Sequence, residues 1–245
     1  MLSGNTERAT VIVPTYKHQD YLRCSLLSIL NSNVPVKIIV VPVIDDEPTL
    51  ERLTELNESM YGFTNVQIIA SEKADPFVQM QLGLDNVQTE FFTVIGSDDF
   101  MLPNAVRRML EIAVWSNSVN PVVGLSYAVT DSNLNITSIE RLKPFSLSRM
   151  MKGSIIPDTA LVKTQNARLV GGFLNAGPNF GYLNHYAFYN RLIKLQGTQV
   201  ILSQDIGCLY RQLPGSRHSQ RYHNAEAIRI HKAKLREVAQ YYARA

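Results

Sequence analysis

The sequence predicts an α/β fold in which a mostly parallel central sheet is flanked by helices. Two observations carry this prediction. Short apolar segments alternate with segments whose apolar residues recur at helical spacing through the first half of the chain. Several of these apolar segments also stop at polar turns that contain Asp, Thr or Pro. Strands that alternate with helices pair in parallel through right-handed crossovers, so we expect a Rossmann-like sheet.

Four strands are expected in the first half, at residues 9–13, 36–44, 66–70 and 91–95. The helix after the first strand has Leu22 and Leu26 at helical spacing, and Asp20 is placed to cap its first turn. The helix before the fourth strand opens at Asp75-Pro76, a capping residue followed by proline at the first helical position. The first half therefore has the order expected of βαβ units.

The pattern changes after a helix that contains Val106, Met109 and Ala113. Two apolar segments, 122–130 and 136–141, follow and are separated by a polar turn. This spacing predicts a small antiparallel hairpin in the second half. At 245 residues with 45% hydrophobic content, the whole chain is long enough for one substantial core, and we expect a single domain over residues 1–245.

The composition also predicts a compartment. No apolar run approaches the ~18 to 20 residues that cross a bilayer, and residues 1–8 lack the hydrophobic core of a signal peptide. We therefore expect a cytoplasmic protein. Its two cysteines, Cys24 and Cys208, lie far apart in apolar segments, which suits buried reduced thiols.

Carboxylates follow two of the expected strands. Asp98 and Asp99 come after the strand at 91–95, and Asp45 and Asp46 end the strand at 36–44. The carboxyl ends of parallel strands are where open α/β sheets bind ligands, and hard oxygen ligands suit Mg²⁺ or Mn²⁺ carrying a diphosphate. Paired Asp residues are also ordinary turn and capping residues, so the spacing alone leaves both interpretations open.

Six segments in the right order resemble motifs of the family 2 glycosyltransferases of the GT-A fold. That family transfers a sugar from a nucleotide-diphosphate donor. The segments, each followed in parentheses by the family motif that it resembles, are 13–16 (P-T-Y), 45–49 (D-D-G-S-T), 83–84 (R-G-L), 95–103 (D-x-D-D-x-x-x-P), 170–173 (G-G-F) and 210–216 (Y-R-x-x-P-G-S). The resemblance implies a GT-A Rossmann-like fold with a nucleotide-sugar half at 1–115, an acceptor half at 116–223 and a C-terminal amphipathic basic helix at 224–245.

The resemblance also implies how the donor is held. Pro14, Thr15 and Tyr16 are expected to line the nucleotide pocket through backbone and ring contacts. Asp45 or Asp46 is expected to accept a hydrogen bond from the nucleobase. A uracil-like base fits this arrangement, so a UDP-sugar is the expected donor.

The acid segment departs from the family pattern. Gly96 stands where the family has the first Asp, so the triplet reads Gly96-Ser97-Asp98. By resemblance, Asp98 with Asp99 holds Mg²⁺ or Mn²⁺, while Ser97 and Arg211 bind the substrate. The missing carboxylate leaves open whether the metal is dispensable.

The family's catalytic base, an Asp in an E-D pair, is also replaced. Counting back from Arg191 places Asn184-His185 at that pair. An imidazole can take the proton of an acceptor hydroxyl, so His185 is the candidate base. Two alternatives remain: His185 is a packing histidine, or the base is Asp158 or Asp205.

The C-terminal segment is basic, with eight Lys and Arg against two acids from Arg211 onward. It is interpreted as a packing helix that docks through residues such as Leu235 and Val238. Alternatively, Arg211, Arg217 or His218 stabilises the diphosphate, or the segment attracts an anionic acceptor, either nucleic acid or a membrane-associated molecule.

The predicted function is transfer of a sugar from a nucleotide-diphosphate donor to an acceptor hydroxyl, with inversion. Two alternatives stay open. One is a nucleotide-sugar-binding protein that has lost turnover, motivated by Gly96 and His185. The other is a glycosyltransferase that acts on nucleic acid, motivated by the basic segment with Tyr222, Tyr241 and Tyr242. The sequence contains no P-loop, no G-x-G-x-x-G and no H-E-x-x-H, which argues against NTPases, dinucleotide enzymes and zinc proteases.

Overall fold

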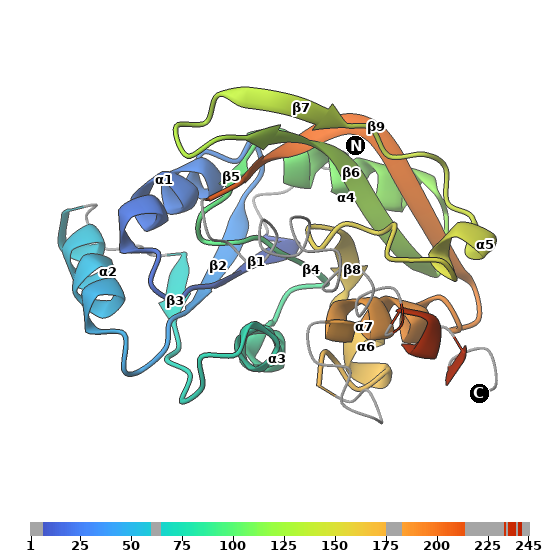
Figure 1. Cartoon of the computed structure of the whole chain (residues 1–245), viewed down its shortest axis with the longest axis horizontal. Coiled ribbons are helices and arrows are strands. Elements are labelled where there is room, and N and C mark those ends of the chain that lie inside the picture. The colour runs from blue at the N-terminus through green and yellow to red at the C-terminus, as the bar shows by residue number, and fades with distance from the viewer. Residues whose placement is uncertain are drawn as a thin grey trace.

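The computed structural model describes residues 7–59, 65–174, 183–213, 233, 235–238 and 240–241. In these residues one mixed sheet has the strand order β3-β2-β1-β4-β8-β6-β9-β5, and β7 pairs with β6 off this path (Figure 1). The strands are β1 (Ala9–Pro14), β2 (Val36–Val41), β3 (Val66–Ile68), β4 (Phe91–Val94), β5 (Phe100–Met101), β6 (Asn120–Thr130), β7 (Ile136–Glu140), β8 (Leu161–Lys163) and β9 (Thr198–Arg211). The helices are α1 (Gln19–Leu30), α2 (Glu47–Ser59), α3 (Pro76–Asn86), α4 (Ala105–Trp115), α5 (Leu147–Met150), α6 (Thr164–Leu169) and α7 (Asn184–Leu192).

The first half is the parallel part of the sheet. Strands β3, β2, β1 and β4 pair in parallel, and helices connect them. The strands of this part are short, apolar and, except for β3, largely buried, as strands covered on both faces are. The α/β fold and the parallel first half predicted from the sequence are therefore confirmed.

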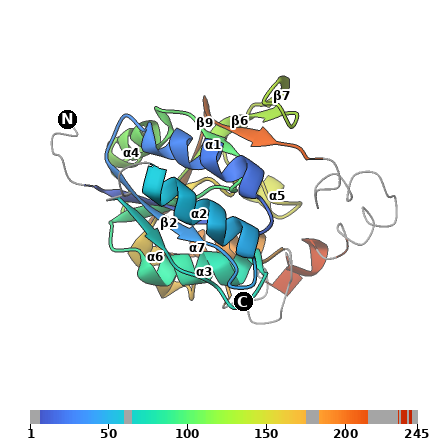
Figure 2. The ribbon, with the colours of Figure 1, turned by 90° about the vertical axis from the view of Figure 1, so that its left-hand side faces the viewer.

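Helices cover both faces of this parallel part. Figure 2 shows α1 and α2 on one side of the sheet and α3 and α6 on the other. Because neighbouring residues of a strand point to opposite faces, Ile12 packs in the same cluster as Phe77 of α3, while Val11 and Val13 pack with Leu22 of α1. Two apolar clusters therefore hold the sheet between them.

The second half has the predicted antiparallel hairpin. Strands β6 and β7 pair antiparallel from Tyr127↔Glu140 to Thr130↔Ile136. In the turn, the carboxylate of Asp131 accepts hydrogen bonds from the side chain of Asn135 and from the backbone N–H groups of Asn133 and Asn135, and these bonds lower the pKa of Asp131. Strand β8 runs antiparallel between β4 and β6, and β9 pairs in parallel with β6.

Some local predictions need correction. The side chain of Asp75 caps α3, accepting hydrogen bonds from Phe77 N at 2.8 Å and Val78 N at 3.3 Å, as expected. Asp20 does not cap α1: the N-cap residue is His18, and Asp20 lies within the first turn. Strand β2 ends at Val41, earlier than predicted, because Pro42 has no N–H to continue the ladder.

Two glycines of the expected motifs occupy positions that exclude a side chain. A Cβ on Gly83 in α3 would lie 2.5 Å from Ile12 Cγ2, so this glycine lets α3 pack closely on β1. Gly172, in the turn after α6, has a φ of +65°, and a Cβ there would overlap Gln81 Oε1. Gln81 Oε1 also accepts a hydrogen bond from Phe173 N at 2.7 Å, which fixes this turn on α3.

Only a few residues of the C-terminal segment are described. Leu235 and Val238 are buried and join the same apolar cluster as Met150 and Tyr186, which supports the interpretation of a packing helix for this short stretch. Residues 214–232, which include Arg217, His218 and Tyr222, lie outside the described residues, as does Tyr242. Cys24 and Cys208 are both free thiols, as predicted, but only Cys208 is buried and Cys24 is partly exposed. Burial raises the pKa of Cys208 to about 12. Among the described residues, the longest apolar helices are too short to cross a membrane.

Candidate active site

The ends of β1, β2 and β4 meet at one edge of the sheet. The backbone N–H of Lys17, just after β1, donates to Asp46 Oδ2 at 2.6 Å. The His18 ring is hydrogen-bonded through Nδ1 to Ser97 Oγ, after β4, at 3.1 Å. The three predicted strand ends are thus brought together, and their polar residues form one edge, which we call the strand-end region (residues 14–18, 45–46 and 96–99).

A buried glutamine holds two of these ends in register. Gln79 of α3 donates from Nε2 to the backbone oxygen of Thr15 at 2.9 Å and to that of Val41 at 2.6 Å. The side chain of Gln79 is almost fully buried. Gln79 therefore gives the Thr15 carbonyl a partner beyond the end of β1, and it is a second donor to the Val41 carbonyl, which also accepts the Thr15 N–H at 3.1 Å.

The predicted nucleotide-pocket residues differ in exposure. Pro14 ends β1 and is half-buried, Thr15 is 1% exposed and Tyr16 is 39% exposed. Thr15 Oγ1 has no hydrogen-bond partner within the described part of the chain. A buried hydroxyl without a partner carries a free-energy cost that a hydrogen bond to a ligand would remove.

The two aspartates after β2 are not equivalent. Asp46 is 4% exposed and faces the loop after β1, whereas Asp45 is exposed to solvent. Asp46 Oδ2 already accepts the Lys17 N–H, and the carboxylate has further acceptor sites for a ligand N–H. The sequence left these two residues as alternatives, and their burial favours Asp46.

The acid loop at 96–99 is compact. Asp99 is 7% exposed and accepts a hydrogen bond from Arg211 N at 2.8 Å. Burial raises the pKa of Asp99 well above its usual value, and the charge of Asp98 raises it further. A Cβ on Gly96 would lie 2.8 Å from Asp98 Oδ1 and 2.9 Å from Asp99 Oδ2. The two carboxylates therefore occupy the space that a side chain at 96 would need.

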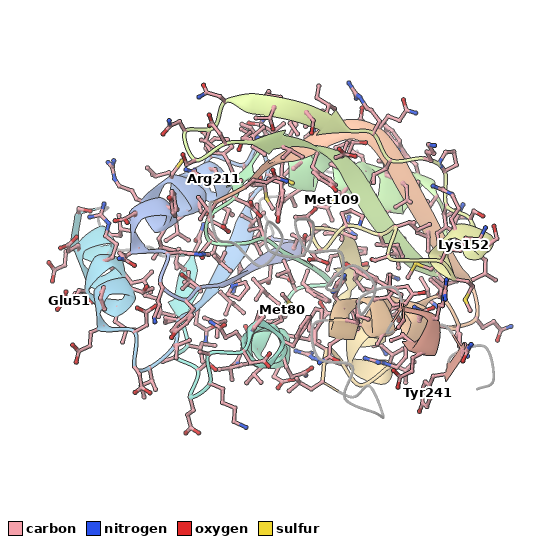
Figure 3. The ribbon with its side chains drawn as sticks, in the orientation of Figure 1. Glu51, Met80, Met109, Lys152, Arg211 and Tyr241 are labelled. Atoms are coloured by element: carbon pink, nitrogen blue, oxygen red, sulfur yellow. The ribbon has the colours of Figure 1, made fainter. Side chains whose placement is uncertain are left out.

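Arg211 supports this loop from β9. Its Nε donates to the backbone oxygen of Asp98 at 2.7 Å, and its Nη1 donates to the backbone oxygen of Ser132 at 2.5 Å. Its guanidinium lies over the ring of Tyr21, 4.6 Å from the centroid, and Figure 3 shows Arg211 beside α1. Arg211 thus ties the acid loop to α1 and to the β6–β7 turn.

The candidates for holding a metal ion in the acid loop are its two carboxylates. Within the described residues there is no group of three or more His, Cys, Asp or Glu side chains that could hold a metal ion. Asp98 is the more accessible carboxylate, with His18 Nδ1 3.9 Å from its Oδ1. Mg²⁺ is commonly held by one or two carboxylates plus waters and substrate phosphates, so Asp98 and Asp99 fit an ion that arrives with a diphosphate.

His185 lies in the first turn of α7, beside a carboxylate. Its Nε2 is 3.6 Å from Asp158 Oδ1, and its ring stacks on Phe77 with centroids 6.3 Å apart and planes 5° apart. Tyr189 Oη donates to the backbone oxygen of Pro157 at 3.1 Å, which fixes the segment that carries Asp158. We call Phe77, Asp158, His185 and Tyr189 the His185 region.

The charge of Asp158 links the His185 region to the acid loop. The pKa of Asp99 is raised by burial and Asp98, and also by the charge of Asp158. Burial raises the pKa of Tyr210 on β9, and the charges of Asp99, Asp98 and Asp158 raise it further. Asp158 is therefore close enough to interact with Asp99 and with Tyr210. Asp205, the other alternative base, is instead paired with Arg108 at 2.6 Å, and that pairing lowers its pKa.

Several residues of the site were not identified from the sequence. His18 and Gln79 make contacts between segments far apart in the chain, and the only sequence signal was a polar residue at a buried helical position in the case of Gln79. Asn184 is a third: its Oδ1 is buried and lacks a partner in the described part of the chain.

Comparison with solved structures defines the class of protein first. S. aureus TarS matches with a TM-score of 0.65 and 15% identity over 84% of this chain and 37% of that chain. TarS 1–349 in complex with UDP-GlcNAc matches with a TM-score of 0.65 and 17% identity over 86% of this chain and 60% of that one. The mannosyltransferase PcManGT from Pyrobaculum calidifontis, in complex with GDP-Man and Mn²⁺, matches with a TM-score of 0.64 and 15% identity over 96% of this chain and 73% of that one. The fold is therefore the GT-A fold of glycosyltransferases.

Sequence comparison then gives the family. Residues 10–168 match the family described as Glycosyl transferase family 2, and the chain belongs to that family. The Bacillus subtilis (strain 168) "Minor teichoic acid biosynthesis protein GgaA" is 27% identical over 118 residues, which is 46% of this chain and 26% of GgaA. An "Uncharacterized glycosyltransferase" of Haemophilus influenzae (strain ATCC 51907 / DSM 11121 / KW20 / Rd) is 22% identical over 84% of this chain and 80% of that protein. The chain thus spans about a quarter of the length of GgaA and a larger share of the second relative.

Proposed function

We propose that the chain transfers a sugar from a UDP-sugar to an acceptor hydroxyl with inversion, and that His185 is the general base. The observation that carries this proposal is the His185–Asp158 pair, 3.6 Å apart, which the charge of Asp158 links to the acid loop. Family membership supports sugar transfer in general. Fold neighbours in complex with UDP, UDP-GlcNAc and GDP-Man support a nucleotide-sugar donor.

The donor nucleotide would be held by the strand-end region. The buried, unpartnered Thr15 hydroxyl and the remaining oxygen of Asp46 suit hydrogen bonds to a nucleobase or ribose. Tyr16, which is partly exposed at the same edge, suits a ring contact with the base. Pro14 would form the floor of this nucleotide pocket, and Ser97 would contribute a hydroxyl near His18.

Asp98, with Asp99, would hold Mg²⁺ or Mn²⁺ on the diphosphate. The ion would neutralise charge on the leaving group as the glycosidic bond breaks. Arg211 adds a positive charge beneath the same loop, where it is fixed by its contacts with Asp98 and Ser132. The presence of Mn²⁺ in the PcManGT complex supports a divalent ion here.

His185 would deprotonate the acceptor. With Nε2–H directed toward Asp158 Oδ1, Nδ1 is the nitrogen that can accept the proton of the attacking hydroxyl. The Asp158 carboxylate would then stabilise the imidazolium that forms, as an orienting carboxylate does for other histidine bases. Attack from the face opposite the diphosphate gives inversion.

A screen of nucleotide sugars tests this proposal. Thermal shift and release of the nucleotide are measured for UDP- and GDP-sugars with Mn²⁺ and with EDTA, with and without a panel of acceptors. We expect stabilisation and turnover with a UDP-sugar. Stabilisation without turnover across all acceptors would support the binding-protein alternative, which Gly96 and the absence of an Asp at 185 favour.

A further inference from the structure

A second concave site is lined in part by Asp205 and Ile206 of β9. It is a cavity of about 560 Å³ whose lining includes Arg107, Arg108 and Glu111 of α4, Arg141 after β7, and Asp205 of β9. None of these residues belongs to the strand-end or His185 regions. Its size falls within the range of small-ligand pockets.

A bulge in β9 builds one wall of this cavity. Leu125 pairs with Ser203 and the next residue, Ser126, pairs with Ile206, so two extra residues of β9 protrude. Bulges re-aim side chains and are common beside functional sites. The buried Ser126 hydroxyl donates to the Ser203 oxygen at 2.9 Å and accepts the Leu142 N–H at 2.9 Å. One hydroxyl thus fastens the bulge to the segment that carries Arg141.

The bulge holds two of the arginines in place, and Glu111 of α4 pairs with the third. Arg108 Nε donates to Asp205 Oδ2 at 2.6 Å, and Arg141 Nη1 donates to the Gln204 oxygen at 2.5 Å. Arg107 Nε donates to Glu111 Oε1 at 3.0 Å. Within the described part of the chain, these hydrogen bonds use one N–H of each guanidinium, and a guanidinium has five. Arg108 Nη1 also lies 3.7 Å from Glu111 Oε2, so the donors that remain for a ligand come mainly from Arg107 and Arg141.

The lining has mixed charge, with three arginines and two carboxylates around one cavity. Arginine forks match the oxygens of a phosphate in paired geometry, while carboxylates accept hydrogen bonds from hydroxyl groups. We propose that this cavity binds the phosphate ester of a sugar or other polyol. The ester is either a separate small molecule or part of the acceptor.

The cavity is distinct from the proposed donor site. Asp205 precedes Arg211 by six residues on β9, a separation of about 15 to 20 Å along an extended strand. Variants of the cavity should therefore leave binding of UDP unchanged, so that the failure of this inference can be told from the failure of the proposed function.

The only tryptophan of the chain reports on this cavity. Arg108 Cζ lies 5.5 Å from the centroid of the Trp115 ring. Titration of the full chain with glycerol 1-phosphate, inorganic phosphate or glycerol is followed by tryptophan fluorescence. We expect a saturable change with glycerol 1-phosphate, binding at least about fivefold weaker with inorganic phosphate, and no change with glycerol.

Variants sharpen the test. Arg107→Gln and Arg141→Gln should each weaken binding of glycerol 1-phosphate by about tenfold or more, because each removes a charged donor. Arg52→Gln is the matched control, since it breaks an exposed arginine–glutamate pair on α2, and its binding should equal wild type. Thermal melting checks that all three variants fold.

Three outcomes would overturn the inference. They are a fluorescence change that does not saturate, affinity unaffected by both arginine variants, and equal affinity for inorganic phosphate and the ester. Kinetics then separate the two sources of ester. If the ester is part of the acceptor, Arg141→Gln should raise the acceptor KM but not the donor KM. If the ester is a separate molecule, glycerol 1-phosphate should alter the rate at saturating acceptor.

Discussion

The strand-end region and the His185 region are held in place by different interactions. In the strand-end region, hydrogen bonds between buried side chains and the backbone fix the loops, as Gln79 does for Thr15 and Val41. In the His185 region, aromatic packing on Phe77 positions the imidazole, and the Asp158 side chain is 58% exposed. We therefore expect the strand-end region to bind a ligand that always has the same shape, and the His185 region to stay accessible to an acceptor. Donor binding and turnover should therefore respond to different substitutions.

The largest expected effect tests the His185 region. His185→Ala should lower kcat by about 10² to 10⁴ while the Kd of UDP stays unchanged, because a general base acts only on the acceptor step. Steady-state kinetics and calorimetry measure the two quantities. Asp158→Asn is the companion variant, and we expect a smaller loss because it keeps the shape and removes only the charge.

The pH dependence gives an independent readout of the same residue. The wild-type rate should fall as the pH is lowered, because a protonated imidazole cannot accept the proton of the acceptor hydroxyl. His185→Ala should lose this acid limb, and His185→Asp should regain activity at lower pH. A kcat of His185→Ala close to wild type would mean that His185 is a packing residue, and Asp158 would become the next candidate base.

The C-terminal segment should matter for stability more than for recognition. Leu235 is 9% exposed in the apolar cluster with Val238, so Leu235→Ala should lower the free energy of unfolding by about 2 to 4 kcal/mol. Arg236→Gln changes an exposed residue of the same turn and should cost less than about 0.5 kcal/mol. Denaturant titrations measure both, and the opposite order would favour a recognition role.

The two aspartates after β2 provide a matched pair for the strand-end region. Asp46→Ala should raise the Kd of UDP by about 10- to 100-fold, because the variant loses the buried carboxylate that we propose as a donor-binding group. Asp45→Ala removes the same charge one residue away, on an exposed side chain, and should leave the Kd within about twofold. Equal effects would show that charge alone, and no direct contact, determines donor affinity.

The smallest expected effect concerns the metal. Asp98→Asn should abolish most of the gain in donor affinity that Mn²⁺ gives over EDTA, a gain that we expect to be about tenfold. The fold should be unchanged, since Asp98 lies in a strand-end loop outside the core. If calorimetry finds the same nucleotide affinity with Mn²⁺ and with EDTA in the wild type, metal dependence is wrong.

The sequence was a good guide to the parallel first half and a poorer guide to the site. Hydrophobic periodicity and capping residues such as Asp75 are local signals, and they predicted elements that the structure has. The choice between Asp45 and Asp46 was out of reach, because both follow the same strand and only the direction of the loop decides which is buried. The pairing of His185 with Asp158 was also out of reach, since it joins residues 27 positions apart across α6 and α7.

Gly96 has a consequence for how the acid loop can change during evolution. Because Asp98 and Asp99 fill the space next to its Cα, an aspartate restored at 96 would meet two carboxylates at once. Restoring the family's first Asp therefore requires the side chains of Asp98 and Asp99 to move away from the space that they now occupy. The effect of a substitution at position 96 should therefore depend on how freely the side chains of Asp98 and Asp99 can turn aside.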